Sequence, residues 1–262
     1  LVSVVGDLSG SEGSLARVVT VLDRKNSLTR TIDDHANDER IIVANVDQMA
    51  IVIATTNPEP REGFVDRALV VAYDQGIEPI IIMTKQDLAS GNSFLETYKD
   101  LEIKIFKIDK SSDLSKLQHA LSNKVTVLLG HSGVGKSTLV NALEPKLDLK
   151  TKKISVQHAQ GQHTTTFAEM FDLSNNIRII DTPGIRGFGM VDMEKQEVSD
   201  YFPELFALKE ACKFNNCLHK EEPNCAVKKA LDEDKITWSR YQSYLKILEG
   251  DEEQYRNDIY GE

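Results

Sequence analysis

Residues 130–137 read GHSGVGKS and form the stretch of this chain best suited to chemistry. Glycines allow a turn to point its backbone N–H groups inward around a phosphate, because no Cβ stands in the way. The Lys136 ammonium would reach the β- and γ-phosphates of a nucleoside triphosphate, and the Ser137 hydroxyl would ligate Mg²⁺. An apolar run over 125–129 and a helical pattern over 138–143 supply the strand and helix that such a loop joins. The predicted nucleotide contacts in this stretch are Gly130, His131, Ser132, Gly133, Val134, Gly135, Lys136, Ser137 and Thr138.

Residues 84–87 (TKQD) form a second candidate site, directly after an apolar run over 78–83. The Asp87 carboxylate can accept two hydrogen bonds from the N1–H and exocyclic amine of guanine, whereas adenine offers no such pair. The Lys85 stem can lie over the base plane while its charge stays near water, and Thr84 completes the predicted guanine site. A Lys-x-Asp in a solvated loop is a common alternative, but the accompanying phosphate loop favours a nucleotide. The two motifs together predict that the nucleotide is GTP.

Residues 181–184 (DTPG) form a third candidate site, after an apolar run over 177–180. Asp181 would hold Mg²⁺ through a water molecule. The Gly184 N–H would sense the γ-phosphate. An isolated turn of this composition would mean little, so its functional reading depends on the phosphate loop that precedes it.

Residues 161–166 (GQHTTT) lie in a polar stretch between the phosphate loop and the DTPG motif. A threonine there can complete the Mg²⁺ coordination only while the γ-phosphate is present, which makes the segment a switch. Spacing does not separate Thr164 from Thr165, and we favour Thr165. The predicted Mg²⁺ ligands are therefore Ser137, Thr165 and Asp181.

The residue after Gly184 is Ile185, and an isoleucine cannot orient an attacking water. If GTP is hydrolysed, the polar group must come from elsewhere. His163 is the best-placed candidate and His131 the second, while the alternative is that both are simply exposed histidines. Slow intrinsic turnover, accelerated by a partner, is the natural hypothesis. The predicted catalytic residues are His163, Lys136 and Thr165.

The three cysteines of the chain lie close together with one histidine, within fourteen positions. An odd number of clustered cysteines is unfavourable for disulfides and favourable for a metal site in a reducing cytoplasm. Three thiolates and one imidazole can form a closed tetrahedral site for a structural Zn²⁺. Buried free cysteines beside an unrelated histidine are the alternative. The predicted zinc ligands are Cys212, Cys217, His219 and Cys225.

Local basic clusters accompany two of these motifs. A solvated face is one meaning of such clusters, and contact with nucleic-acid phosphates is the other. The formal net charge of −10 nevertheless argues against a broadly basic surface over the 262 residues. The lysines concerned are Lys146, Lys150, Lys152, Lys153, Lys213, Lys220, Lys228 and Lys229.

The elements that must position these motifs alternate between strand and helix from residue 47 to residue 180. Such alternation predicts an α/β fold with a mostly parallel sheet covered on both faces, and ligands on such sheets bind at the carboxyl ends of strands. Each motif of this region follows a predicted strand. The strands are expected over 47–54, 78–83, 103–108, 125–129, 167–172 and 177–180, and the helices over 64–74, 93–98, 114–121 and 138–143.

The two ends of the chain differ from this central region. Short strands over 1–5, 16–22 and 40–43 are too little to close a five-stranded barrel, so they predict either part of a barrel or a small edge elaboration. The segment after residue 198 is rich in Cys, Lys and Asn, with helices expected near Cys225 and over 235–248. We expect three domains, over 1–44, 45–198 and 199–262.

No apolar run is long enough to cross a bilayer, and no secretory signal is visible. We therefore expect a cytoplasmic protein with no membrane partner. Nothing in the sequence demands more than a monomer.

The order of the motifs is unusual, because residues 84–87 precede the phosphate loop that comes first in ordinary GTPases. The same sheet can be built from this order if the chain is circularly permuted. The order, the GHSGVGKS loop, HTTT, DTPG and the Cys/His cluster together resemble the ribosome small-subunit-dependent GTPase A family of bacteria. The resemblance covers almost the whole chain, including residues 45–48 (NVDQ) and 65–67 (VDR).

This resemblance implies an N-terminal OB-fold, a circularly permuted GTPase domain and a small helical zinc domain. It also implies a role in late maturation of the small ribosomal subunit, whose binding stimulates GTP hydrolysis. By the same resemblance His163 matches the family's proposed water-orienting histidine, and Cys212, Cys217, His219 and Cys225 match its zinc ligands.

The chain departs from the family pattern in two places. The OB-fold looks partial, with residues 4–7 (VVGD) resembling an interior part of the barrel, which would leave its RNA-binding face incomplete. Thr84 stands where many GTPases have asparagine, and its hydroxyl can replace only part of the bonding of an amide.

We predict a Mg²⁺-dependent GTP hydrolase whose nucleotide state controls docking on the small ribosomal subunit and its rRNA. One alternative is a GTP-switched factor that binds another RNA or protein without ribosomal stimulation. The other is a non-hydrolysing scaffold, in which Ile185 reflects lost hydrolysis.

Overall fold

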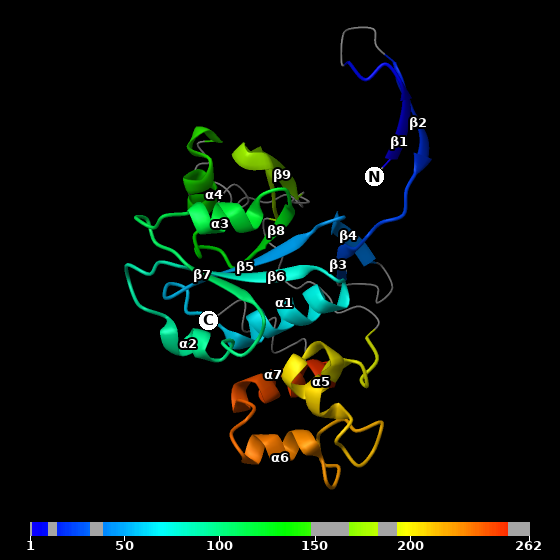
Figure 1. Cartoon of the computed structure of the whole chain (residues 1–262), viewed down its shortest axis with the longest axis vertical. Helices are drawn as coiled ribbons and strands as arrows, with labels where there is room; N and C mark the ends of the chain where they lie inside the picture. Colours follow the sequence, from blue (N-terminus) through cyan, green and yellow to red (C-terminus); the bar gives the residue numbers. More distant parts are fainter. Residues whose placement is uncertain (1, 10–14, 32–38, 148–167, 183–192, 251–262) are drawn as a thin grey trace, which may run out of the picture.

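A computed structural model describes residues 2–9, 15–31, 39–147, 168–182 and 193–250. Its centre is a six-stranded sheet in the order β7-β6-β5-β8-β10-β9 (Figure 1). The first five strands of this order are mutually parallel, and β9 pairs antiparallel with β10 at one edge. The predicted mostly parallel sheet is therefore confirmed. The strands are β5 (Gln48–Ala54), β6 (Glu78–Thr84), β7 (Lys104–Lys107), β8 (Val125–Leu129), β9 (Glu169–Leu173) and β10 (Ile177–Asp181).

The middle strands are buried on both faces, which explains their nearly continuous apolar sequences. All seven residues of β5 and all five of β8 are buried. Alternate β5 residues point to two separate cores. Met49, Ile51 and Ile53 pack in one core with the helix α1, whereas Ala50 and Val52 pack in the other with α3 and α4. These helices are α1 (Glu62–Asp74), α2 (Asn92–Glu96), α3 (Ser115–Leu121) and α4 (Lys136–Leu143).

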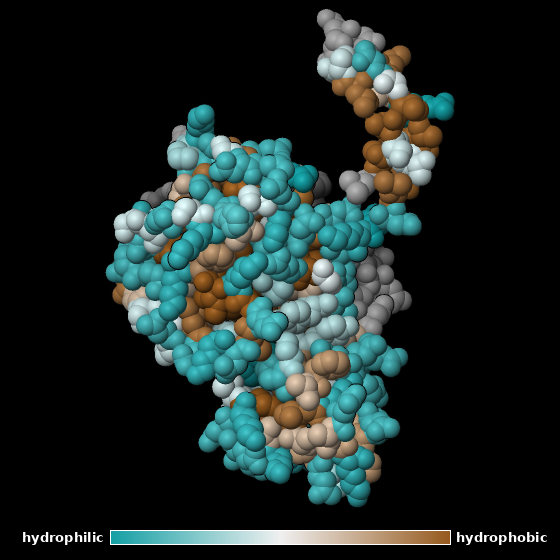
Figure 2. All heavy atoms as spheres, in the orientation of Figure 1, coloured by the Kyte–Doolittle hydropathy of each residue, from teal (hydrophilic) through white to brown (hydrophobic). Residues whose placement is uncertain are grey.

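The described N-terminal residues form two separate antiparallel pairs. β1 (Val2–Gly6) pairs with β2 (Ala16–Val21), and β3 (Ser27–Thr31) pairs with β4 (Glu39–Ala44). Leu28 and Val43 pack the second pair into the core that lies between the central sheet and α1. The first pair projects from the molecule with exposed valines along its length (Figure 2). The strand β3 was not among the predicted strands, and a partial OB-fold stays a prediction because the described strands here do not close a barrel.

The C-terminal helical unit comprises residues 193–250 and lies against α1, on the side of α1 away from the sheet (Figure 1). Its core contains Phe202, Leu205, Val227 and Tyr244. The helices expected near Cys225 and over 235–248 are present as α6 and α7, whereas α5 was not predicted. Their bounds are α5 (Pro203–Lys209), α6 (Ala226–Asp232) and α7 (Trp238–Glu249), with 3₁₀ turns at Pro145–Leu147, Ser174–Asn176 and Val198–Tyr201.

A buried ion-pair network joins this helical unit to α1. The Arg240 guanidinium on α7 donates to the Asp66 carboxylate on α1, with an Nη1–Oδ1 distance of 2.6 Å. It also donates to both carboxylate oxygens of Glu204 on α5, at 2.6 and 3.1 Å. Arg240 is 2% exposed and Asp66 is 0% exposed, so this pair is shielded from solvent. The three-domain division remains a proposal, in which α1 carries the contact between the second and third domains.

Among the described helices, none combines the length and the apolar character that a bilayer span requires.

Candidate functional site

The phosphate loop connects β8 with α4, as predicted, at the carboxyl edge of the sheet. At Gly130 a Cβ would lie 2.4 Å from the carbonyl oxygen of Val52, so only glycine fits beside the neighbouring strand β5. Gly133 and Gly135 have φ angles of +82° and +99°, which side chains rarely tolerate. The glycine spacing therefore follows from the path that the backbone must take.

Lys136 lies at the start of α4, and its ammonium group points back into the phosphate loop. The Nζ donates hydrogen bonds to the carbonyl oxygens of Gly130 and His131, the latter at 3.1 Å. Burial lowers the pKa of Lys136, and the nearby charge of Asp181 acts in the opposite direction. The partly buried ammonium is thus held at the centre of the loop, where a phosphate would be bound.

Asp181 ends β10, the strand next to β8. Burial raises the pKa of its carboxyl group, while Lys136 pulls that pKa down. Its Oδ1 is buried and has no hydrogen-bond partner among the described residues. A buried acidic oxygen without a protein partner, beside a phosphate loop, fits a Mg²⁺ site in which Asp181 and Ser137 take part.

The guanine motif and the phosphate loop are in direct contact. The Thr84 hydroxyl donates to the carbonyl oxygen of Val134 at 2.6 Å, and the carbonyl of Ile53 lies at 3.2 Å from the same oxygen. A Cβ added to Gly135 would lie 3.7 Å from the Thr84 hydroxyl. Thr84 thus supplies a bond between the two motifs, although it stands where many GTPases have asparagine.

Lys85 and Asp87 complete the motif after β6. Lys85 has a φ angle of +59°, and its ammonium donates to the backbone carbonyls of Thr56, at 3.3 Å, and Asn57. The Thr55 hydroxyl in turn donates to the Lys85 carbonyl at 2.8 Å. Asp87 is exposed, as a group that meets an incoming base would be.

The loop after β5 and the first turn of α1 are parts of the site that the sequence did not reveal. Pro58 in this loop lies 3.8 Å from the position of a Cβ at Gly133, and the Phe64 ring packs on the His131 ring with their centroids 4.5 Å apart. The only sequence signal was a Pro-rich segment at the carboxyl end of a buried strand.

His131 was the second candidate for orienting water. Burial lowers its pKa, helped by the charges of Arg61 and Lys136. Its Nε2 is buried without a partner among the described residues, and its ring lies against Phe64. This position favours a packing role for the neutral imidazole.

Several predicted residues lie outside the described part of the chain, and their roles stay predictions. They are His163, Thr164, Thr165, Gly184 and Ile185, together with Lys150, Lys152 and Lys153.

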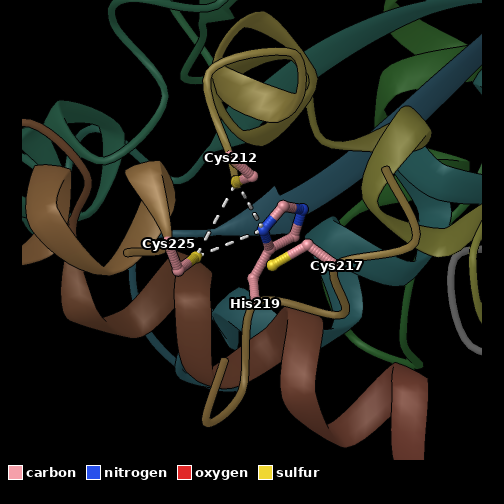
Figure 3. A group of neighbouring side chains, drawn as sticks. All are labelled: Cys212, Cys217, His219 and Cys225. Atoms are coloured by element: carbon pink, nitrogen blue, oxygen red, sulfur yellow. Dashed lines mark hydrogen bonds between the residues drawn. The ribbon is translucent and has the colours of Figure 1, made fainter. Parts of the chain in front are cut away.

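The four predicted zinc ligands come together in the C-terminal helical unit (Figure 3). Their candidate ligand atoms all lie within 4.8 Å of one another. The His219 Nδ1 lies 3.5 Å from the Cys212 Sγ and 3.4 Å from the Cys225 Sγ, and these sulfurs are 4.0 Å apart. Zinc–sulfur bonds of about 2.3 Å imply tetrahedral edges of about 3.8 Å, so the donor set fits one Zn²⁺.

Two tyrosines on α7 hold the backbone around this cluster in place. The Tyr241 hydroxyl donates to the His219 carbonyl at 2.6 Å, and the Tyr244 hydroxyl donates to the Leu218 carbonyl at 2.7 Å. The Ala226 N–H donates to the Cys212 Sγ at 3.4 Å, which favours a thiolate there.

Burial also sets the protonation of the cluster. It raises the pKa of Cys217 to about 12 and raises that of Cys225, whereas it lowers the pKa of His219. Neutral imidazole is the form that ligates metal, but the thiols must lose protons to do so.

Comparison with known proteins identifies the family. The chain matches the RsgA GTPase family over residues 21–191. It is 52% identical to the small ribosomal subunit biogenesis GTPase RsgA of Flavobacterium johnsoniae, over 96% of this chain and 80% of that protein. The chain belongs to the RsgA GTPase family. The RsgA protein of Bacteroides fragilis is 42% identical, over 96% of this chain and 85% of that protein.

Solved structures agree with this assignment. YjeQ from Thermotoga maritima superposes with a TM-score of 0.72 at 30% identity, covering 90% of this chain and 78% of YjeQ. YloQ, described as a circularly permuted GTPase, gives a TM-score of 0.71 at 26% identity, covering 96% of this chain and 79% of YloQ. The permuted motif order predicted from the sequence is therefore confirmed, and the chain is an RsgA-family GTPase that acts on GTP with Mg²⁺.

Proposed function

We propose that this RsgA-family GTPase hydrolyses GTP in the maturation of the small ribosomal subunit. The observation that carries the GTP part is the contact of Thr84 with Val134, which joins a guanine motif to a phosphate loop across the strand β5. The relatives from Flavobacterium johnsoniae and Bacteroides fragilis, which are small ribosomal subunit biogenesis GTPases, support the ribosomal part.

The site residues divide the work of binding and hydrolysing GTP among them. Backbone N–H groups of the phosphate loop and Lys136 bind the phosphates, and Asp87 with Lys85 reads guanine. Ser137 and Asp181 would hold Mg²⁺, whose charge stabilises the transferring phosphoryl group. Thr165 and Gly184 would respond to the γ-phosphate, and His163 would orient the attacking water. Because Ile185 cannot orient water, a partner that orders the switch would raise the hydrolysis rate.

The Cys/His cluster is proposed to hold one structural Zn²⁺. Four protein donors leave no open coordination position, which is typical of a structural rather than a catalytic metal. The helical unit that it stabilises carries Lys213, Lys220, Lys228 and Lys229, and these lysines could meet rRNA phosphates. The protein would act as a monomer in the cytoplasm, where small subunits are assembled.

The deciding experiment is GTP turnover by the purified chain, with and without purified small ribosomal subunits. We expect slow turnover alone and stimulation by the subunits. Unchanged slow turnover would support a GTP switch for another partner. No turnover in either condition would support a non-hydrolysing scaffold. A His163→Ala variant that kept full stimulation would remove the proposed role of His163.

A further inference from the structure

The helix α1 is held from two sides. One stripe of α1, formed by Val65, Ala68 and Leu69, packs on the sheet. Another stripe, formed by Asp66, Val70 and Asp74 at four-residue spacing, faces the C-terminal helical unit. It contains Asp66, bonded to Arg240, and Asp74, which accepts a hydrogen bond from the Tyr201 hydroxyl at 2.8 Å. α1 is therefore held between the sheet and the helical unit, and its first turn follows the loop at the carboxyl end of β5.

Phe64 lies in the first turn of α1, two residues before Asp66. Two residues correspond to about 200° of helix rotation, so Phe64 points away from the helical unit. Its ring reaches the phosphate loop and packs on His131, with a centroid separation of 4.5 Å and an interplanar angle of 45°. The side chain of Phe64 is 8% exposed, so the contact is largely shielded from water.

A movement of His131 would be passed on to the rest of the phosphate loop. It follows Gly130, whose Cα leaves no room for a side chain, and its own carbonyl accepts a hydrogen bond from the Lys136 ammonium. A shift of His131 would therefore move an atom that orients the phosphate-binding lysine. Its buried Nε2 has no hydrogen-bond partner among the described residues, and the contact described for its ring is the packing on Phe64.

The loop that leads into α1 reinforces this arrangement. Pro58 approaches Gly133 of the phosphate loop, and the Lys85 ammonium bonds the carbonyls of Thr56 and Asn57. The guanine motif, the segment before α1 and the phosphate loop are thus interlocked by neighbouring contacts.

We propose that Phe64 is a positioning residue for nucleotide binding, acting through His131 to hold the phosphate loop in its binding shape. The proposal rests on GTP binding at this loop and does not depend on the ribosomal role. Phe64 touches no reacting atom, so its effect appears in the affinities for both GTP and GDP. The step of hydrolysis itself stays unchanged once GTP is bound.

The test compares Phe64→Leu with Phe94→Leu, a control aromatic residue that packs against the same core and contacts the ring of Tyr98 rather than that of His131. Titration with a fluorescent GDP analogue and a non-hydrolysable GTP analogue gives the two dissociation constants. We expect Phe64→Leu to raise both by about three- to tenfold, the worth of one aromatic contact, while Phe94→Leu stays at the wild-type values. At saturating GTP, kcat of Phe64→Leu should remain within about twofold of the wild type.

A second comparison isolates the His131 contact. In a His131→Ala background, Phe64→Leu should cause no further loss of affinity, because the partner ring is already gone. The proposal would be overturned by an equal loss in that background, by equal effects of the two Leu substitutions, or by a large fall in kcat at saturation. Nucleotide titration uses no ribosomal subunits, so its outcome is independent of whether subunits stimulate turnover.

Discussion

The hydroxyl of Thr84 donates a 2.6 Å hydrogen bond to the carbonyl of Val134, and this bond joins the end of β6 to the phosphate loop that follows β8. The two residues lie on either side of β5, which separates their strands in the sheet. A hydroxyl can thus make the inter-motif contact at a position where many GTPases use an amide. Thr84 is buried, so the bond is shielded from competing water.

Replacing Thr84 by valine should weaken binding of GTP and GDP alike. The substitution keeps the shape of the side chain but leaves the buried Val134 carbonyl without its donor, which costs about 1–2 kcal/mol. Titration of a fluorescent GDP analogue should show a dissociation constant raised by about five- to thirtyfold. Thr84→Ser keeps the hydroxyl and serves as the control. Equal affinities for Thr84→Val and the wild type would contradict the role of this bond.

Replacing Asp87 by alanine should remove the preference for guanine over adenine. The exposed carboxylate is the group that would pair with two guanine donors, and two charge-assisted bonds are worth about 3 kcal/mol or more. Competition of GTP and ATP for the same site should show the GTP advantage falling by about a hundredfold or more. Asp100→Ala, at another exposed aspartate, is the acidic control. A retained GTP preference in Asp87→Ala would place guanine recognition elsewhere.

Zinc binding should release protons and strengthen as pH rises. Burial raises the pKa values of Cys217, to about 12, and Cys225, so both thiols carry protons at pH 7 in the metal-free chain and must lose them to bind Zn²⁺. The lowered pKa of His219 means that the imidazole contributes no proton. Calorimetry in two buffers of different ionisation enthalpy should count about two to three protons per zinc.

The same zinc experiment has a matched variant. Cys217→Ser removes one thiolate ligand, so both the zinc affinity and the proton count should fall. A zinc affinity that does not change between pH 6 and pH 8 would exclude thiolate coordination. Less than about half an equivalent of zinc in the purified chain would count against the site itself.

Replacing Arg240 by alanine should destabilise the protein strongly. The guanidinium is 2% exposed and pairs with the fully buried Asp66, so its removal leaves a buried carboxyl group without its cation at a cost of about 3–5 kcal/mol. Urea unfolding at pH 7 measures this loss. Lys220→Ala, which breaks the exposed pair of Lys220 with Glu249, should leave the unfolding midpoint unchanged.

The loss in Arg240→Ala should depend on pH in a defined direction. Burial already raises the pKa of Asp66, and removing the Arg240 charge raises it further. A carboxyl with a raised pKa in the folded state binds protons more tightly than the unfolded chain does, so the folded variant gains stability as pH falls. Its deficit relative to the wild type should therefore shrink from pH 8 to pH 5. A deficit that grows on acidification would show that Asp66 is not the group left unpaired.

The sequence alone was sufficient to identify the sites whose residues lie close together along the chain. The phosphate loop, the TKQD and DTPG motifs and the Cys/His cluster each place their groups within a few residues, and local backbone geometry then brings those groups together. Their order along the chain was sufficient to predict the permuted GTPase fold and its mostly parallel sheet. The apolar runs located the central strands to within a residue or two, because strands buried on both faces tolerate little else.

Only the tertiary structure decided how these local motifs contact one another. Thr84 and Val134 are 50 residues apart, and Asp66 and Arg240 are 174 apart. The packing of the Phe64 ring on His131 likewise joins two different elements. Such pairs are set by strand order and helix placement, which no local pattern encodes. The short strand β3 was missed for the same reason, since its pairing with β4 and the burial of Leu28 against the core stabilise it more than its own composition does.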